Sequence, residues 1–193
     1  MINIVIFGGP GSGKGTQSAK IAKKYGLFHI STGDVLRDHI ARKTDIGKVA
    51  HSYISQGMLI PDKLMIKILE DLMRSRVEET KHGVIFDGFP RTLPQAQELD
   101  MLLTTLDTRI EAVIGLEVPD DELTKRLLLR GQESGRSDDN AEAIRTRLAV
   151  YHKQTKPLME YYKETGRYHA INGVATIDEI FDQICAVIDK ANE

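Results

Sequence analysis

Short apolar runs alternate along this chain with longer segments whose apolar residues recur at helical spacing. The first run, Ile2–Phe7, is apolar apart from Asn3. Continuous runs of this kind are typical of strands that are buried on both faces of a parallel sheet. We predict strands at residues 2–7, 27–30, 84–87, 111–118 and 167–171.

Helical spacing occupies most of the chain between these runs. We predict helices at residues 14–25, 44–55, 94–105, 120–129 and 177–188, with others through Val35–Ile40, from residues 58–62 to 76, through Ile144–Tyr151 and, beyond a break at Pro157, at 158–162. Strands that alternate with helices predict an α/β protein with three layers and a parallel sheet. The short helices between the second and third strands are expected to form an insert over one end of the sheet.

The glycine-rich sequence GGPGSGKGT, Gly8–Thr16, follows the first strand directly. Glycines let the backbone curl with its N–H groups inward, and a helix N-terminus attracts anions, so this stretch is typical of a phosphate-binding loop. Lys14 adds a flexible charge that can reach the β- and γ-phosphates of a nucleotide. The alternative is a plain turn between a strand and a helix. The general pattern has Ser or Thr directly after the lysine, whereas Gly15 precedes Thr16 here, so the usual hydroxyl ligand of magnesium is not expected.

The third predicted strand ends in a carboxylate, Asp87. At this end of a strand, beside a phosphate loop, an acid can hold a magnesium ion or its waters. The alternative is a side chain that accepts hydrogen bonds from turn N–H groups. Arg91 follows Pro90, and the fixed backbone of a proline helps to hold the guanidinium in one place.

Two further segments place arginines beside turns. Ser31 and Asp34 resemble a capping box that starts a helix, and capping alone would explain them. Arg37 follows at a place where its positive charge opposes the helix dipole. This placement favours a bound anion nearby. The loop at residues 130–140 has arginines at both rims and glycines inside, as in a lid that folds over an anion, with a solvated surface loop as the alternative. Arg147 lies on the next helix, at the border of its apolar face.

These cations indicate the reaction class. A phosphate acceptor is already anionic at neutral pH and needs no general base, but it must be brought against a second polyanion. Each pair of unit charges 4 Å apart costs on the order of 4 kcal/mol at an effective dielectric constant of about 20, so several cations must converge. The candidates are Lys14, Arg37, Arg91, Arg130, Arg136 and Arg147. A lid that assembles them only around both substrates would suppress transfer to water.

Composition narrows the possible partners. The 193 residues carry a formal net charge of −2, which gives no general attraction for nucleic acid or for an anionic membrane. Cys185 is the only cysteine, so neither an internal disulfide nor a cysteine-based zinc cluster is expected. The start of the chain lacks the pattern of a signal peptide and no run is long enough for a membrane span. We expect a cytoplasmic monomer of one domain.

The motifs together resemble the adenylate kinase family along the whole chain. The matching segments are GGPGSGKGTQ, STGDVLR, QGMLIPD, FDGFPRTLPQ and RGQESGRSDDN with the downstream Arg147. The resemblance implies a P-loop kinase fold whose CORE has a five-stranded parallel sheet, with a helical insert that binds a nucleoside monophosphate (NMP) at residues 31–60 and a short LID at 130–140. It implies reversible transfer of the γ-phosphoryl group of ATP to AMP, giving two ADP, and it makes Gly15 a mark of the family.

The resemblance also implies the roles of individual residues. ATP would be bound by Gly11, Ser12, Gly13, Lys14, Gly15, Thr16, Arg130 and Ala175; AMP would be bound by Thr32, Arg37, Met58, Leu59, Ile60, Gly88, Phe89, Pro90, Arg91, Gln95, Arg136 and Arg147. The catalytic groups would be Lys14, Arg91, Arg130, Arg136 and Arg147. Magnesium would be held mainly by nucleotide phosphates and waters, without a direct protein ligand and with Asp87 bound to it through water. The LID lacks the four zinc ligands of some longer relatives, so no zinc is expected.

Two alternative functions stay open on the sequence. UMP/CMP kinases share the loop and LID patterns, but they tend to have asparagines after the FPR triplet, where this chain has Thr92 and Gln95, and Ala in place of Thr32. A glutamine amide offers both a donor and an acceptor to the Watson–Crick edge of adenine. A P-loop ATPase or switch needs a group that positions water and usually Ser or Thr after the lysine, and neither is evident.

Overall fold

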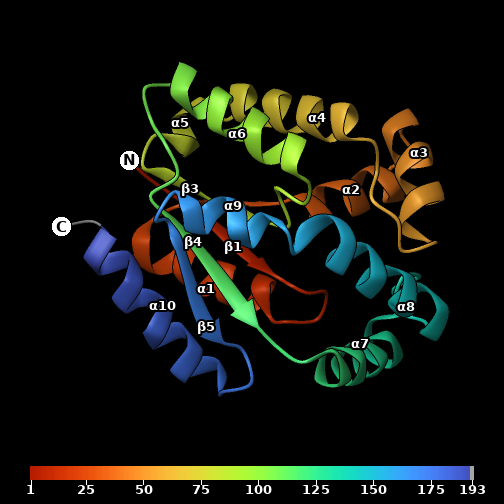
Figure 1. The fold of residues 1–193 in the computed structure, drawn as a ribbon. Helices are drawn as coiled ribbons and strands as arrows, with labels where there is room; N and C mark the ends of the chain where they lie inside the picture. Colours follow the sequence, from red (N-terminus) through yellow and green to blue (C-terminus); the bar gives the residue numbers. More distant parts are fainter. Residues whose placement is uncertain (192–193) are drawn as a thin grey trace.

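The computed structural model describes residues 1–191 and contains a five-stranded sheet in the order β2-β3-β1-β4-β5 (Figure 1). The strands are β1 (Ile2–Gly8), β2 (Phe28–Ser31), β3 (Gly83–Asp87), β4 (Ala112–Glu117) and β5 (Tyr168–Asn172). All neighbouring pairs are parallel. The predicted fold class, α/β with three layers and a five-stranded parallel sheet, is confirmed.

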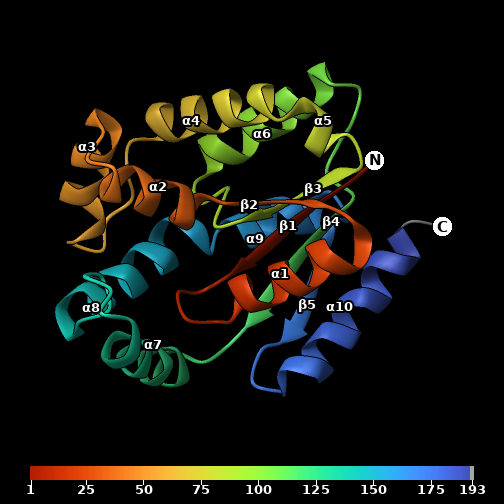
Figure 2. The same cartoon turned by 180° about the vertical axis from the view of Figure 1, so that it is seen from behind.

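Helices connect the strands and cover both faces of the sheet (Figures 1 and 2). They are α1 (Lys14–Tyr25), α2 (Thr32–Ala41), α3 (Asp45–Ile54), α4 (Asp62–Ser75), α5 (Val77–Thr80), α6 (Leu93–Thr105), α7 (Asp120–Ser134), α8 (Ala141–Val150), a π-helical turn η1 (Tyr151–Thr155), α9 (Leu158–Glu164) and α10 (Ile177–Ala191). The predicted break at Pro157 separates η1 from α9, because proline lacks the N–H that would continue the helix.

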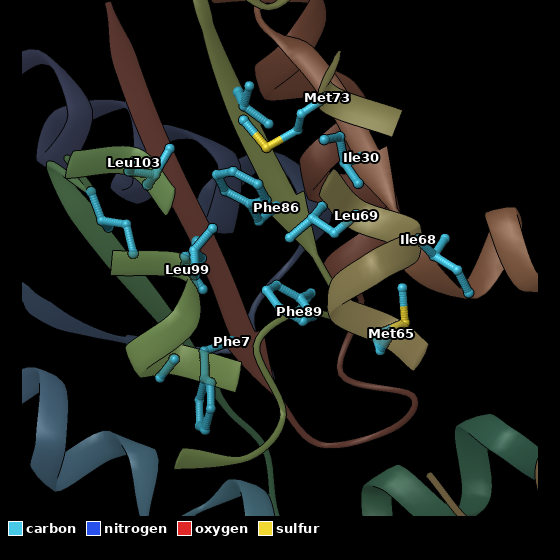
Figure 3. Packing of buried hydrophobic residues seen from close by; sticks show 14 of the residues in the cluster. Phe7, Ile30, Met65, Ile68, Leu69, Met73, Phe86, Phe89, Leu99 and Leu103 are labelled. Carbon is cyan, nitrogen blue, oxygen red and sulfur yellow. The ribbon is translucent and has the colours of Figure 1, made fainter. Parts of the chain in front are cut away.

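The core has two halves because successive residues of a strand point to opposite faces. In β1, Ile4 and Ile6 pack beneath α1 and α10, whereas Val5 and Phe7 pack beneath α4, α6 and α9 (Figure 3). Each of these four side chains is at most 3% exposed. A continuous apolar run was therefore the correct signal for a strand covered on both sides.

Helix α7 extends further than its apolar pattern predicts. We expected it to end at residue 129, but it continues to Ser134, so the first part of the predicted LID loop is helical. Gly131 lies inside the helix at a point where only a glycine fits, because a Cβ atom there would lie 2.5 Å from the carbonyl oxygen of Asp139. The helix ends instead at Gly135, whose left-handed φ of 63° needs a glycine and whose N–H donates to the carbonyl oxygen of Gly131.

The insert and the α7–α8 segment meet at one end of the molecule. Helices α2 and α3 lie at the same end as α7 and α8 in both views (Figures 1 and 2). Gly57, which follows α3, packs so closely on α8 that a Cβ atom would lie 2.6 Å from the carbonyl oxygen of Ala143. The space between them opens at the carboxyl ends of β1 and β3, where ligands bind in open parallel sheets.

Candidate active site

A cavity of about 650 Å³ lies at the carboxyl ends of β1 and β3. The candidate cations, which lie far apart in the sequence, all line this cavity: Lys14, Arg37, Arg91, Arg130, Arg136 and Arg147. A smaller cavity of about 80 Å³ adjoins it, because the two share Arg37, Leu59 and other lining residues. The smaller one is bounded by Thr32, Met58, Leu59, Ile60, Gly88 and Gln95.

The phosphate loop curls at the mouth of α1 with glycines where other residues would be strained or would clash. Gly13 precedes the helix in a left-handed conformation, φ 94°, and no side chain caps the helix. Gly11 has φ 83°, and a Cβ atom on it would lie 2.9 Å from Leu127 Cγ. The N–H groups of the first turn of α1 are thus left for an anion.

Lys14 folds back onto this loop. Its Nζ donates to the carbonyl oxygens of Gly8 and Gly9, at 2.8 and 2.9 Å. Burial lowers the pKa of Lys14 to about 7, and the positive charges of Arg91, Arg147 and Arg130 act in the same direction, while Asp87 opposes them. Near neutral pH the lysine is therefore only partly charged until an anion enters the cavity.

This lowered pKa predicts proton uptake when a nucleoside triphosphate binds. At pH 8 most Lys14 side chains are neutral before binding, whereas the bound phosphates favour the ammonium form, so close to one proton is taken up. At pH 6 the uptake by Lys14 is small because the group is already protonated. Titration calorimetry in buffers of different ionisation enthalpy measures the number of protons taken up at each pH. Lys14→Arg, which keeps the charge and does not titrate, is expected to abolish uptake at pH 8; an unchanged uptake would contradict the assignment to Lys14.

Asp87 lies beside the phosphate loop at the end of β3. Its side chain is largely buried, with the residue 8% exposed, and His29 Nε2 lies 3.4 Å from Asp87 Oδ2. Gly15 comes close to it, since a Cβ atom on Gly15 would lie 3.6 Å from Asp87 Oδ2, in van der Waals contact. Asp87 also lines the cavity, and one carboxylate there suits a magnesium ion that keeps its waters and phosphate ligands, because this ion dehydrates reluctantly.

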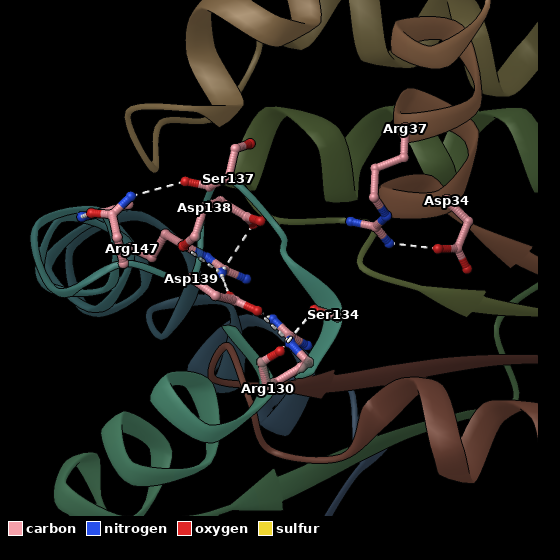
Figure 4. Close-up of polar contacts among 10 residues, drawn as sticks. Asp34, Arg37, Arg130, Ser134, Ser137, Asp138, Asp139 and Arg147 are labelled. Carbon is pink, nitrogen blue, oxygen red and sulfur yellow. Dashed lines mark hydrogen bonds and ion pairs between the residues drawn. The ribbon is translucent and has the colours of Figure 1, made fainter. Parts of the chain in front are cut away.

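Two buried acids hold the arginines of the α7–α8 segment (Figure 4). Arg130 donates to both oxygens of Asp139, at 2.6 and 2.8 Å, and Arg147 donates to Asp139 Oδ1 at 2.7 Å. Arg147 also lies 3.0 Å from Asp138 Oδ2. The paired arginines hold the pKa of Asp139 below its usual range against the opposing effect of burial. The two cations are thus positioned at the cavity before any anion is present.

Arg37 on α2 and Arg136 in the loop between α7 and α8 both line the cavity. Arg37 Nη2 pairs with Asp34 Oδ1 at 2.5 Å, across one turn of α2 (Figure 4). Asp34 also completes half of the predicted capping box, since its N–H donates to Ser31 Oγ at 3.3 Å. Burial and the charges of Arg37 and Arg130 lower the pKa of Arg136. An anion between them would relieve this repulsion.

Arg91 is held through both its side chain and its backbone. Its Nε donates to the carbonyl oxygen of Gly88 at 2.7 Å, while its backbone N–H donates to Gln95 Oε1 and its carbonyl oxygen accepts from Thr155 Oγ1, both at 2.8 Å. Burial, then repulsion by Arg147, lowers the pKa of Arg91 to about 10. The guanidinium is consequently held in a position that is unfavourable for its charge until an anion binds.

Some residues singled out in the sequence lie outside the two cavities. The Phe89 side chain packs in the core and is 1% exposed. Ser12 is 1% exposed, and its hydroxyl has no hydrogen-bond partner within residues 1–191. Ala175 packs against the core half beneath α1 and α10. A ligand in the cavities could contact only backbone atoms of these three residues. Contact with their side chains would require a ligand that extends beyond the cavities.

The acidic partners of the site are not among the residues predicted from the sequence. Asp138 and Asp139 lie in the loop for which only arginines and glycines are predicted to matter, although an adjacent acidic pair between arginines is a usable signal. Asp62 is predicted only to lie at the start of a helix, but it accepts hydrogen bonds from Thr92 and Gln95. Nothing in the local sequence pairs Asp62 with residues so far along the chain.

Within residues 1–191 there is no group of three or more His, Cys, Asp or Glu side chains arranged to hold a metal ion. Over the same residues, none of the helices combines the length and the apolar character that crossing a membrane requires.

Comparison with known proteins gives matches over nearly the full length. A family model described as adenylate kinase matches residues 6–167. The adenylate kinase of Bacteroides fragilis is 56% identical over 189 residues, which cover 98% of this chain and 99% of the relative. That of Bacteroides thetaiotaomicron is 55% identical over 190 residues, covering 98% and 100%. That of Porphyromonas gingivalis is 45% identical over 190 residues, covering 98% and 97%.

Proposed function

This chain belongs to the adenylate kinase family, and we propose that it transfers the γ-phosphoryl group of ATP reversibly to AMP, giving two ADP. The observation that carries the proposal is the convergence of Lys14 and five arginines on one cavity beside a phosphate loop. Two polyanions can approach each other only where such a concentration of positive charge offsets their repulsion. The reaction exchanges one phosphoanhydride bond for another, so it runs readily in both directions.

The donor nucleotide is assigned to the loop and α1. Its phosphates would accept hydrogen bonds from the N–H groups of Gly11–Thr16 and from Lys14, which would leave the carbonyl oxygens of Gly8 and Gly9. Arg130 would lie over the base side of ATP, with Ala175 contributing a backbone contact. When bound with ATP, Mg²⁺ would supply neutralisation of phosphate charge, and Asp87 would hold one or more of its waters.

The acceptor nucleotide is assigned to the smaller cavity and the arginines above it. Arg37, Arg91 and Arg147 would bind the AMP phosphate, and Met58–Ile60 with Gln95 would enclose the base. Arg136 would join the transferring phosphoryl group from the loop between α7 and α8. Spread over the equatorial oxygens, these guanidinium groups stabilise the charge of the transition state without a general base.

The residue spans 31–60 and 130–140 are proposed as the mobile parts, the NMP-binding insert and the LID. Arg130 and Arg147, which Asp139 holds, would bind phosphate through N–H groups that these ion pairs leave free, so closure would be coupled to the presence of both nucleotides. The rest of the chain is proposed to act as a fixed CORE. A cytoplasmic monomer remains our prediction for its cellular state.

A panel of acceptors tests the proposed reaction. With ATP as donor, kcat/KM for AMP is expected to exceed that for CMP, UMP and GMP by a factor on the order of 100 or more, because a site with satisfied polar groups rejects a base that leaves them unpaired. Water is expected to be a poor acceptor, so ATP consumption without AMP should be slight. A coupled assay of ADP formation measures the rate with each of the five acceptors, the four monophosphates and water. Comparable values for CMP or UMP would favour a UMP/CMP kinase, and equal ATP consumption with and without AMP would favour an ATPase.

A further inference from the structure

A partly buried chain of hydrogen bonds joins Asp62, the first residue of α4, to Gln95 in α6. Asp62 Oδ1 accepts from Gln95 Nε2 at 2.8 Å and from Thr92 Oγ1 at 3.0 Å. On its other side Gln95 Oε1 accepts from the backbone N–H of Arg91 at 2.8 Å. Gln95 is 2% exposed and lines the smaller cavity. The amide therefore has a fixed partner at each end.

These partners determine which way round the Gln95 amide lies. A carboxylate only accepts hydrogen bonds, and a backbone N–H only donates them. If the amide turned by 180°, its oxygen would face the Asp62 carboxylate and its NH₂ group would face the Arg91 N–H. Both bonds would be lost and two repulsive contacts would replace them. The orientation thus follows from the chemistry of Asp62 and Arg91.

The fixed amide has capacity left for a ligand. Its oxygen has two lone pairs and its nitrogen two hydrogens, and the bonds to Arg91 and Asp62 use one of each. The remaining acceptor and donor lie side by side in a set order. Adenine presents an N6–H donor beside the N1 acceptor and matches this order, whereas a 6-oxopurine presents an O6 acceptor beside an N1–H donor and matches only the turned amide.

We propose that Asp62 is a positioning residue that makes Gln95 select adenine and reject 6-oxopurine monophosphates. This inference rests on the proposed function, because it places the base of the acceptor nucleotide at Gln95. A glutamine without these partners can turn to suit either kind of purine. Selectivity between the two therefore comes from the Asp62 carboxylate and the Arg91 N–H acting together through Gln95, and Asp62 is the partner that a side-chain substitution can remove.

The test compares AMP with inosine 5′-monophosphate. The base of the latter differs from adenine at positions 1 and 6, where it has N1–H and O6, and it carries no 2-amino group. In the full chain, Asp62→Asn replaces the carboxylate by an amide that can itself turn and donate to the Gln95 oxygen. The ratio of kcat/KM for AMP to that for inosine monophosphate is expected to fall on the order of tenfold or more, the value of one hydrogen bond to a charged group. Asp62→Ser removes the same carboxylate and is expected to lower the ratio too.

The matched control is Thr92→Val. It removes the other hydrogen bond to Asp62 and the side-chain cap of α6, yet leaves the Asp62–Gln95 bond in place. Its stability is expected to fall while the AMP to inosine monophosphate ratio stays within about twofold of the original. If both Asp62 variants also kept the original ratio, with the two substrates losing activity equally, Asp62 would have only a structural role and the proposal would be overturned.

Binding measurements separate this inference from the proposed function. Titration calorimetry of the unaltered protein, Asp62→Asn and Asp62→Ser with AMP and with inosine monophosphate gives the same ratio without turnover. Absence of phosphoryl transfer to AMP would refute the proposed reaction. An affinity ratio that is the same in all three proteins would refute the role of Asp62, whether or not transfer occurs.

Discussion

Replacing Arg91 by alanine is expected to lower kcat about a thousandfold without loss of stability. Arginines that neutralise a transferring phosphoryl group contribute roughly 10³ to 10⁵ in rate. In the protein without ligands, however, burial and repulsion by Arg147 disfavour the Arg91 charge. The contacts of its backbone with Gln95 and Thr155 stay available to an alanine. Steady-state kinetics and thermal unfolding of the same preparation measure both effects.

Arg91→Lys is the matched comparison for this prediction. It keeps a positive charge but loses the planar group that spans two phosphate oxygens, so an intermediate loss, on the order of 100-fold, is expected. An Arg91→Ala variant with kcat within about threefold of the original would show that Arg91 does not act on the transferring group. A parallel loss of activity and stability would instead point to a structural role.

Replacing Lys14 by methionine is expected to lower kcat on the order of a thousandfold while KM for ATP changes less. Methionine has a similar length, although it cannot donate to the carbonyl oxygens of Gly8 and Gly9, and no charge follows the γ-phosphoryl group as it moves. Removing one such preorganised donor costs about 10²- to 10³-fold in enzymes that stabilise a developing charge. Initial rates at saturating ATP and AMP give kcat directly.

Lys20→Met serves as the control for Lys14→Met because it lies on the same helix. Lys20 forms an exposed ion pair with Asp178, and surface pairs of this kind contribute about 0 to 1 kcal/mol to stability. Its kcat is expected to match that of the unaltered protein. Near-normal turnover in Lys14→Met would remove the lysine from the mechanism, and an equal loss in both variants would indicate damage to α1.

The local sequence specified most of the elements because their signals are local. Helix α1 begins and ends where predicted, since Gly13 and Gly26 take left-handed conformations at its two ends, φ 94° and 66°. The β1 run is a strand covered on both faces, as its continuous apolar character indicated. In α7, glycine does not mark the helix end, because Gly131 lies inside the helix. A glycine is needed there to let the backbone of Asp139 pass close to it.

The sequence by itself determined which groups could carry the chemistry: a glycine-rich loop after a strand, a lysine, and arginines beside turns and helix ends. The tertiary structure decided which acids those groups meet. Asp139 holds Arg130 and Arg147 together, and Asp62 holds Gln95. Periodicity and turn signals extend over only a few residues, whereas these pairings depend on how α7 packs on α8 and α4 on α6. The cations were therefore predictable from the chain, and the acidic pair between the arginines offered a signal, but which carboxylate orients which cation or amide became evident only in the folded protein.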